Sequence, residues 1–155
     1  MTERFGVVPT DLLKSVDGLT LLRRVASGDL PAPTMAQTLD FKLVEVEHGR
    51  AVFSGTPSAH HLNPMGTVHG GYGATLLDSC MACAVHSTLP AGTGYTTLEF
   101  KVNLVRAMTE TTREVRAEGR VVHVGRRVAT AEGTLSDREG RLLAHATTTC
   151  MLFPL

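Results

Sequence analysis

The stretch Asn63–Val85, NPMGTVHGGYGATLLDSCMACAV, determines how the rest of this chain is expected to fold. It begins as a polar loop, turns at a His-Gly-Gly elbow and continues as a predicted helix that is apolar on nearly every side. A helix with an apolar surface all round has to be covered all round. Asp78, in the middle of this helix, is costly to bury without partners or a function. We therefore predict a buried central helix and take Asp78 as the leading functional candidate.

The segments that follow the central helix alternate with period two and predict the strands that cover it. Strands are expected within 97–104, 112–124, 129–135 and 141–153, with turns at 124–127 and 137–140. The residues expected on the packed faces are Leu98, Phe100, Val102, Leu104, Val115, Ala117, Gly119, Val121, Ala129, Ala131, Gly133, Leu135, Leu142, Ala144, Ala146, Cys150 and Leu152. The charges that alternate with them between 112 and 124 are expected to form a solvated sheet face.

The segments before the elbow predict one helix and one hairpin. Residues 10–27 place apolar side chains near helical spacing, with Gly18 weakening the helix. Residues 34–46 and 50–56 are typical of a β-hairpin with its turn at 47–50. The order of elements predicts an α+β fold in which an antiparallel sheet curls around one helix. We expect a single domain over 1–155, with an N-terminal helix and a core at about 30–153.

Composition excludes several classes of protein. The chain has 155 residues, is 43% hydrophobic and 19% charged, and carries zero formal net charge. A neutral chain lacks the basic surface of a nucleic-acid-binding protein. The long apolar segment is broken by Asp78 and falls short of the roughly 20 residues that span a bilayer. Because residues 1–18 do not resemble a secretory signal, we expect a cytoplasmic protein without membrane partners.

The three cysteines, Cys80, Cys83 and Cys150, are an odd number and fit a reducing compartment better than a disulfide framework. Cys80 and Cys83 have the C-x-x-C spacing of redox pairs and of half a zinc site. A zinc site would need a second ligand pair at motif spacing, and the sequence has none. We expect these thiols to pack in the core and predict no metal.

The His-Gly-Gly elbow is where chemistry is expected. Gly70 and Gly71 let the backbone turn sharply and approach a ligand closely, and they lie where the first unpaired N–H groups of the helix point outward. An acyl carbonyl placed there would be polarised by an N–H group and by the positive end of the helix dipole. Asp78 lies nine residues beyond His69, roughly 13 Å along the helix axis and on its opposite side. If both groups act on one carbonyl, Asp78 must come from a second copy of the chain.

Structural roles remain open for each of these residues. Gly70 and Gly71 can form a tight loop-to-helix turn without any ligand. Asp78 can accept structural hydrogen bonds. His69 and Asn63 can brace the loop. A single H-G-G motif is weak evidence for an active site. The combination of Asn63, the His-Gly-Gly elbow and Asp78 at this spacing is stronger evidence.

The joint pattern resembles a known family. Asn63-Pro-Met-Gly-Thr-Val-His-Gly-Gly71, then Asp78, then Thr97-x-Glu-Phe-x-Val102 and a late Gly125-Arg126-Arg127 are similar to the hotdog-fold acyl-CoA thioesterases of the phenylacetate-degradation (PaaI-like) family. The likeness covers about residues 30–153. It implies a hotdog fold, dimers paired through edge strands that often assemble into tetramers, and hydrolysis of an acyl-CoA without a metal or redox cofactor.

Roles follow from the resemblance by matching position. It implies that the Gly70 N–H polarises the thioester carbonyl, that His69 shapes the elbow, and that Asn63 holds the water or the carbonyl. Asp78 of the partner chain would act as nucleophile or general base. Thr97 matches a hydroxyl that orients water in some relatives, although its phase in the strand is opposite to the apolar stripe. Substrate-binding candidates are Gly71 at the elbow, Arg106, Arg126 and Arg127 for CoA phosphates, and Tyr72, Met65, Met81 and Leu62 for the acyl pocket.

Two other functions are compatible with the same fold. A hotdog dehydratase or hydratase would place a catalytic histidine in an HFPxxP-type elbow, which this sequence lacks. A non-catalytic acyl-CoA-binding or sensing protein would keep the glycine elbow but would not need Asp78. The carboxylate therefore favours catalysis, while the identity of the acyl group is not readable from the chain.

Overall fold

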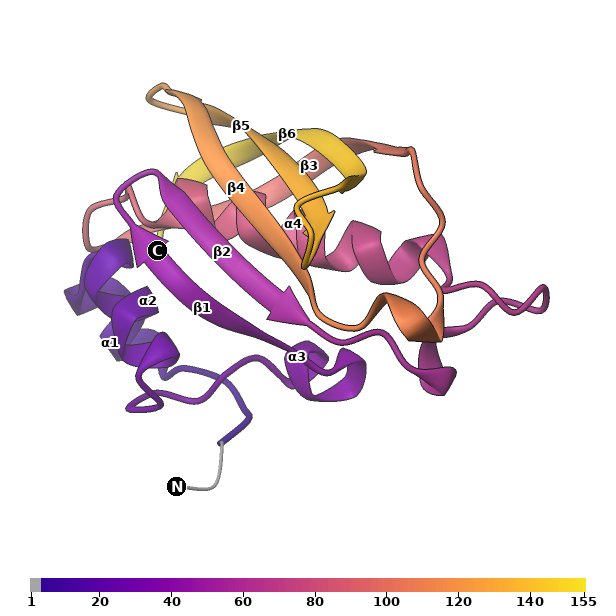
Figure 1. The fold of residues 1–155 in the computed structure, drawn as a ribbon. Helices are drawn as coiled ribbons and strands as arrows, with labels where there is room; N and C mark the ends of the chain where they lie inside the picture. The colour runs from indigo at the N-terminus through magenta and orange to yellow at the C-terminus, as the bar shows by residue number, and fades with distance from the viewer. Residues whose placement is uncertain (1–3) are drawn as a thin grey trace.

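The structure is a computed structural model that describes residues 4–155. Six strands form one antiparallel sheet in the order β1-β2-β4-β5-β6-β3, and the sheet arches over the long helix α4 (Figure 1). The elements in chain order are α1 (Thr10–Ser15), α2 (Gly18–Ala26), α3 (Thr34–Leu39), β1 (Phe41–Glu47), β2 (Arg50–Gly55), α4 (Gly70–His86), β3 (Thr93–Leu104), β4 (Val115–Val124), β5 (Val128–Asp137) and β6 (Leu142–Pro154). Short 3-10 turns lie at Ala59–His61 and Glu110–Thr112. The predicted α+β architecture is confirmed.

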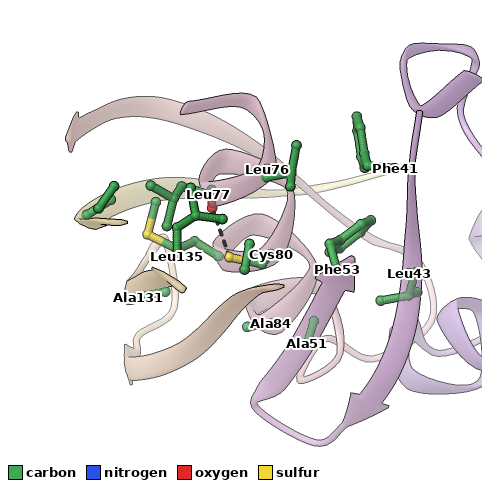
Figure 2. Packing of buried hydrophobic residues seen from close by; sticks show 14 of the residues in the cluster. Phe41, Leu43, Ala51, Phe53, Leu76, Leu77, Cys80, Ala84, Ala131 and Leu135 are labelled. Carbon is green, nitrogen blue, oxygen red and sulfur yellow. Dashed lines mark hydrogen bonds between the residues drawn. The ribbon is translucent and has the colours of Figure 1, made fainter. Parts of the chain in front are cut away.

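The centre of α4 is the core of the molecule. Leu76, Leu77, Cys80 and Met81 have no exposed surface, and they meet alanines and glycines of the central strands (Figure 2). These small residues let the sheet approach closely. A Cβ atom added at Gly119 of β4 would lie 2.3 Å from the carbonyl oxygen of Cys80. The all-round apolar helix is buried because the sheet curls around it.

The N-terminal region differs from the prediction. In place of one helix over 10–27 there are two, α1 and α2, separated at Val16 and Asp17. The Asp17 side chain caps α2 by accepting the Thr20 N–H at 3.0 Å. Gly18 packs against the end of α4, where an added Cβ would lie 1.8 Å from the His86 carbonyl oxygen. This close contact sets the position of the break.

The predicted hairpin is confirmed as β1 and β2, but its first arm is shorter than expected. Residues 34–39 form α3 instead of strand, and Asp40, with φ of 51°, ends that helix in the left-handed region. In the last strand Leu142 is 42% exposed, contrary to expectation, and Leu143 is buried. Ser136 pairs with Leu142 and Leu135 with Ala144, so the register shift inserts Leu143 into the packed face.

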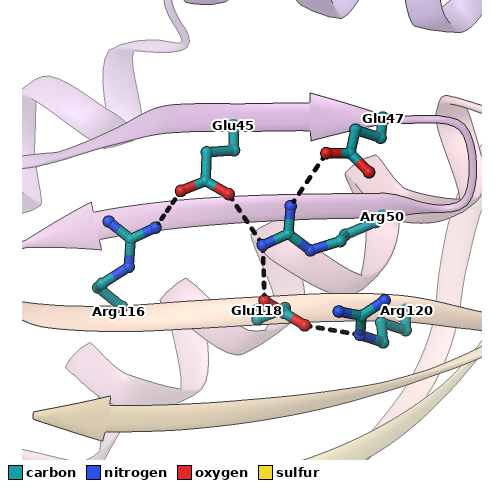
Figure 3. A network of polar contacts seen from close by, with 6 residues as sticks. All are labelled: Glu45, Glu47, Arg50, Arg116, Glu118 and Arg120. Atoms are coloured by element: carbon teal, nitrogen blue, oxygen red, sulfur yellow. Dashed lines mark hydrogen bonds and ion pairs between the residues drawn. The ribbon is translucent and has the colours of Figure 1, made fainter. Parts of the chain in front are cut away.

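The charged residues of β1, β2 and β4 form an ion-pair network on the outer face of the sheet (Figure 3). Arg50 donates to Glu45 and to Glu118, each at 2.8 Å, and Arg116 also pairs with Glu45. These bonds lower the pKa of Glu45 and of Glu118, with the hydrogen bond from Arg50 as the largest cause in both. The solvated charged face predicted for 112–124 is confirmed. Among residues 4–155, no helix has the length and apolarity needed to cross a bilayer.

Candidate active site

The loop before α4 is held by one side chain. Asn63 accepts the Met65 N–H at 2.9 Å through Oδ1 and donates to Thr67 Oγ1 at 2.7 Å through Nδ2. Its backbone N–H donates to the Thr67 carbonyl at 2.8 Å. Gly66, at the turn of this loop, has φ of 81°. Asn63 thus braces the elbow, and one hydrogen of its amide group remains for a ligand.

Two histidines connect this loop to the helix. The His69 N–H donates to the His61 carbonyl at 2.7 Å. The buried His61 ring accepts the Ser58 N–H and lies 4.6 Å from the ring of Tyr72, measured between centroids. Burial lowers the pKa of His61, so its ring is neutral near pH 7. His61 is a positioning residue that the sequence analysis did not identify.

At the first turn of α4 the N–H groups are not equivalent. His69 Nδ1 accepts the Gly71 N–H at 2.9 Å, which places the proton of a neutral ring on Nε2. The Tyr72 N–H donates to the His69 carbonyl at 3.0 Å. Within residues 4–155 the Gly70 N–H has no acceptor. Gly70 therefore supplies the free donor at the positive end of α4.

The expected reason for the two glycines needs correction. Neither Gly70 nor Gly71 has a positive φ, so the chain does not need glycine there for a sharp turn. Close approach is the observed reason. A Cβ at Gly70 would lie 2.5 Å from Leu104 Cδ1, and one at Gly71 would lie 2.9 Å from His69 Nδ1. Leu104, which borders the elbow, was predicted only as a packing residue.

Asp78 is paired within its own chain. The Thr97 hydroxyl of β3 donates to Asp78 Oδ1 at 3.0 Å, and Asp78 is half-buried. The sequence pattern placed Thr97 on the opposite phase to the apolar stripe. A bulge resolves the conflict: Thr97 pairs with Cys150 and Glu99 with Thr149, leaving Leu98 without a partner. Thr97 therefore lies on the same helix-facing side of the sheet as Phe100, Val102 and Leu104.

The apolar stripe of β3 is not packed in the protomer, contrary to the prediction. Leu98 and Leu104 are each 56% exposed, and Phe100 is 39% exposed. Phe100 and Leu104 pair with Thr148 and Ala144, which are buried on the helix-facing side of β6. Phe100 and Leu104 thus lie on the helix-facing side of the sheet but stay partly exposed in the protomer. β3 is also the last strand of the sheet, and no other strand within residues 4–155 pairs with its outer edge.

The arginine candidates lie at opposite ends of the sheet. The Arg106 N–H donates to Leu143 of β6, and the Arg127 carbonyl accepts from Leu152 of the same strand. Leu143 and Leu152 are nine residue steps apart along β6, which is about 30 Å at the usual rise per residue. Arg126 lies beside Arg127 in the turn between β4 and β5, and all three arginines are exposed. One protomer does not bring them together.

The remaining candidates are divided between surface and core. Met65 is 86% exposed at the tip of the elbow loop, and Leu62 is partly buried at its base. Tyr72 and Met81 are buried in the protomer, on the core side of α4. The Tyr72 hydroxyl has no hydrogen-bond partner among the described residues, and burial raises the pKa of this group.

The cysteines are free thiols. Cys80 and Cys150 are buried, and the Cys80 thiol donates to the Leu77 carbonyl at 3.2 Å (Figure 2). Burial raises the pKa of the Cys83 thiol to about 12, which keeps it protonated at neutral pH. Residues 4–155 contain no group of three or more side chains placed to hold a metal ion.

The comparisons with known proteins agree with this geometry. The thioesterase superfamily matches residues 65–144, which include the elbow, α4 and the strands up to the start of β6. The chain belongs to the thioesterase superfamily. The hotdog fold and the PaaI-like resemblance predicted from the elbow are confirmed. Among curated proteins, none matches this superfamily member.

Three solved structures illustrate the relationship. A phenylacetic acid degradation-related protein from Ralstonia eutropha is 32% identical, with a TM-score of 0.76 over 84% of this thioesterase-superfamily chain and 98% of its own. A variant of the phenylacetic acid degradation protein PaaI from Thermus thermophilus is 28% identical, with a TM-score of 0.68 over 76% and 97% of the two chains. A thioesterase protein from Streptococcus pneumoniae, solved with coenzyme A, is 26% identical, with a TM-score of 0.66 over 74% and 89%.

Proposed function

We propose that this protein hydrolyses an acyl-CoA thioester to the free acid and CoA. The unpaired Gly70 N–H at the start of α4 carries the proposal, since it can donate to the oxygen that becomes negative when the carbonyl is attacked. A small or aromatic acyl group is the expected substrate. Support comes from the relatives named for phenylacetic acid degradation and from the Streptococcus pneumoniae protein solved with coenzyme A.

Asp78 is the group proposed to start the reaction. Thr97 occupies Oδ1, which leaves Oδ2 for the reactants. As general base, Asp78 takes a proton from water while the water oxygen attacks the acyl carbon; the C–S bond then breaks and the proton passes to the CoA sulfur. As nucleophile, its oxygen displaces the thiolate to form an anhydride, which water then opens. Turnover in ¹⁸O-water distinguishes the two, because ¹⁸O in the Asp78 carboxylate requires the anhydride.

Two copies are required for this chemistry. α4 is continuous from Gly70 to His86, so Gly70 and Asp78 lie about 12 Å apart along its axis and cannot meet at one carbonyl. The free edge of β3 and its exposed Leu98, Phe100 and Leu104 offer a surface for a second copy. We propose that the partner's α4 brings its carboxylate to this elbow, and that such dimers assemble further into tetramers.

The same pairing accounts for the separated arginines. Arg106 follows β3 near its own elbow, whereas Arg126 and Arg127 lie near the Thr97 end of the sheet. If one elbow meets the opposite chain's Asp78, then Arg106 of one chain and the 126–127 turn of the other border one site. Their guanidinium groups are proposed to bind CoA phosphates. The reaction needs no metal or redox cofactor, because CoA enters as part of the substrate.

The decisive experiment measures free thiol released from a panel of acyl-CoAs. The native protein is expected to release thiol, and Asp78→Asn to lose nearly all turnover with its unfolding temperature preserved. Glu132→Gln is the matched control, since it neutralises an exposed β5 carboxylate on the face of the sheet that points away from α4. Equal rates for native protein and Asp78→Asn would exclude the proposed role, and binding of CoA without any thiol release would favour a sensing function.

A further inference from the structure

A cavity lies away from the elbow, under the N-terminal segment. Its volume is about 570 Å³.

 A smaller pocket of about 380 Å³ lies beside it and shares Phe5, Phe41 and Lys42 with it. The larger cavity is bordered mainly by apolar side chains, among them Leu22, Val25, Leu30, Phe41, Leu43 and Phe53.

The roof of the cavity is an ordered part of the chain. Gly6 N–H donates to the Ala32 carbonyl and Ala32 N–H donates to the Arg4 carbonyl, both at 2.9 Å, so the N-terminal segment is tied to the connector between α2 and α3. Pro31 and Pro33 restrict that connector because proline fixes φ. The walls therefore come from α2, this connector, β1 and β2, which lie together beside the edge of the sheet (Figure 1).

The size and lining of the cavity match those of a small-molecule site. Protein interiors leave few voids larger than a water molecule. Ligand pockets of about 300–1,000 Å³ are mostly apolar and carry few polar groups. A cavity of ≈ 570 Å³ bordered by three phenylalanines, Phe5, Phe41 and Phe53, falls in that class.

The charges at the cavity have one sign. Arg4 and Lys42 are the charged residues that border it, and no described carboxylate does so; Asp40 borders the smaller neighbouring pocket. Neither cation forms an ion pair within residues 4–155. Arg4 donates to the Asp29 carbonyl at 3.0 Å, and Lys42 is exposed. An apolar ligand with an anionic end would pack against the apolar side chains and pair with Arg4 or Lys42.

The cavity is separate from the carboxylate of the proposed active site. Cys83 is the residue of α4 that borders it. Asp78 lies five residues earlier, about 140° around the helix axis, where it is bonded to Thr97 of β3. We propose that this cavity binds an apolar monocarboxylic acid, with its hydrocarbon part among the phenylalanines and its carboxylate near Arg4 and Lys42.

Calorimetric titration with octanoate tests the proposal, and 1-octanol tests the part played by charge. Octanoate is expected to bind saturably and more tightly than 1-octanol. Lys42→Gln and Arg4→Gln should each weaken octanoate about two- to fivefold, as expected for an exposed ion pair, and leave 1-octanol unchanged. Val25→Phe, which fills the cavity from α2, should abolish binding of both. Asp78→Asn is the control for the elbow and should bind octanoate as the native protein does.

Each opposing result overturns the proposal. Absence of saturable binding at millimolar octanoate excludes the site. Equal affinity for octanoate and 1-octanol, or unchanged affinity in both charge variants, excludes recognition of the carboxylate. Unchanged binding in a folded Val25→Phe protein places the ligand elsewhere. If Val25→Phe does not fold, contacts between octanoate protons and the Phe41 and Phe53 rings in the native protein, measured by NMR, decide the location.

Discussion

The Thr97 hydroxyl donates to Asp78 Oδ1 at 3.0 Å, although 19 residues separate the two in the chain. The bulge at Leu98 makes this contact possible, because it turns Thr97 toward α4 while the apolar residues after it keep the same face. The bond orients the carboxylate, and within residues 4–155 its second oxygen has no hydrogen-bond partner. Thr97 therefore acts as a positioning residue for the proposed base or nucleophile.

Replacing Thr97 by valine should lower kcat about ten- to 150-fold with little change in KM, because a hydrogen bond to a charged group typically contributes about 1.5–3 kcal/mol. Thr97→Ser keeps the hydroxyl and should recover most of the rate. Steady-state kinetics on one acyl-CoA checks both variants. A loss of rate in Thr97→Ser as large as in Thr97→Val would argue against the hydrogen bond.

A site shared between chains predicts rescue by mixing two inactive proteins. Gly70→Pro removes the free N–H, and His69, with ψ of 134°, already has the extended backbone that precedes proline. The new Cβ would meet only the end of the exposed Leu104 side chain, which can move aside. Asp78→Asn removes the carboxylate. Refolding equal amounts together should restore about a quarter of native turnover, since half of randomly paired dimers are mixed and each has one intact site. Mixtures as inactive as their components would show that each site lies within one chain.

Close packing of the sheet on α4 predicts a large effect of one methyl group. Gly119→Ala should lower the free energy of unfolding by about 3 kcal/mol or more, because the new Cβ would meet the Cys80 backbone, which cannot move aside. Gly6→Ala is the matched control, since its Cβ would make an ordinary contact of 3.7 Å with Pro31. Urea unfolding measures both, and equal stabilities would contradict the packing described.

The unpaired hydroxyl of Tyr72 predicts a conservative change that does no harm. Tyr72→Phe should leave the free energy of unfolding unchanged or raise it by up to about 1 kcal/mol, because it removes a buried polar atom without a partner. Tyr72→Ala, in contrast, should cost about 3–5 kcal/mol through the lost packing. Thermal unfolding of the two variants separates these effects; a clear loss of stability in Tyr72→Phe would reveal an unrecognised partner.

The ion pairs of Arg50 predict a dependence of stability on acid. The pKa values of Glu45 and Glu118 are lowered in the folded protein, so their contribution is present above the unfolded pKa of about 4.3 and is lost as the pH falls through the folded values. Arg50→Gln should flatten this part of the stability curve. Urea unfolding from pH 6 to pH 3 tests it, and parallel curves for the two proteins would refute the linkage.

The chain's local pattern was sufficient for the central features. The apolar surface of residues 70–86 required a cover, and the alternation of the later segments identified the strands that provide it. Periodicity and helix-end chemistry depend on neighbours in sequence, which is why α4 and the elbow could be predicted. The functional roles of Gly70 and Asp78 stay predictions. The inward faces of β4 and β5 followed from the same rule.

Other features depend on contacts between distant segments. The break at Gly18 follows from its packing on His86, and the orientation of Thr97 follows from a bulge set by pairing with β6. The exposure of Phe100 and Leu104 depends on which elements the fold places against β3. No local pattern encodes these relations, because a register shift or a close approach is a property of two segments brought together by the fold.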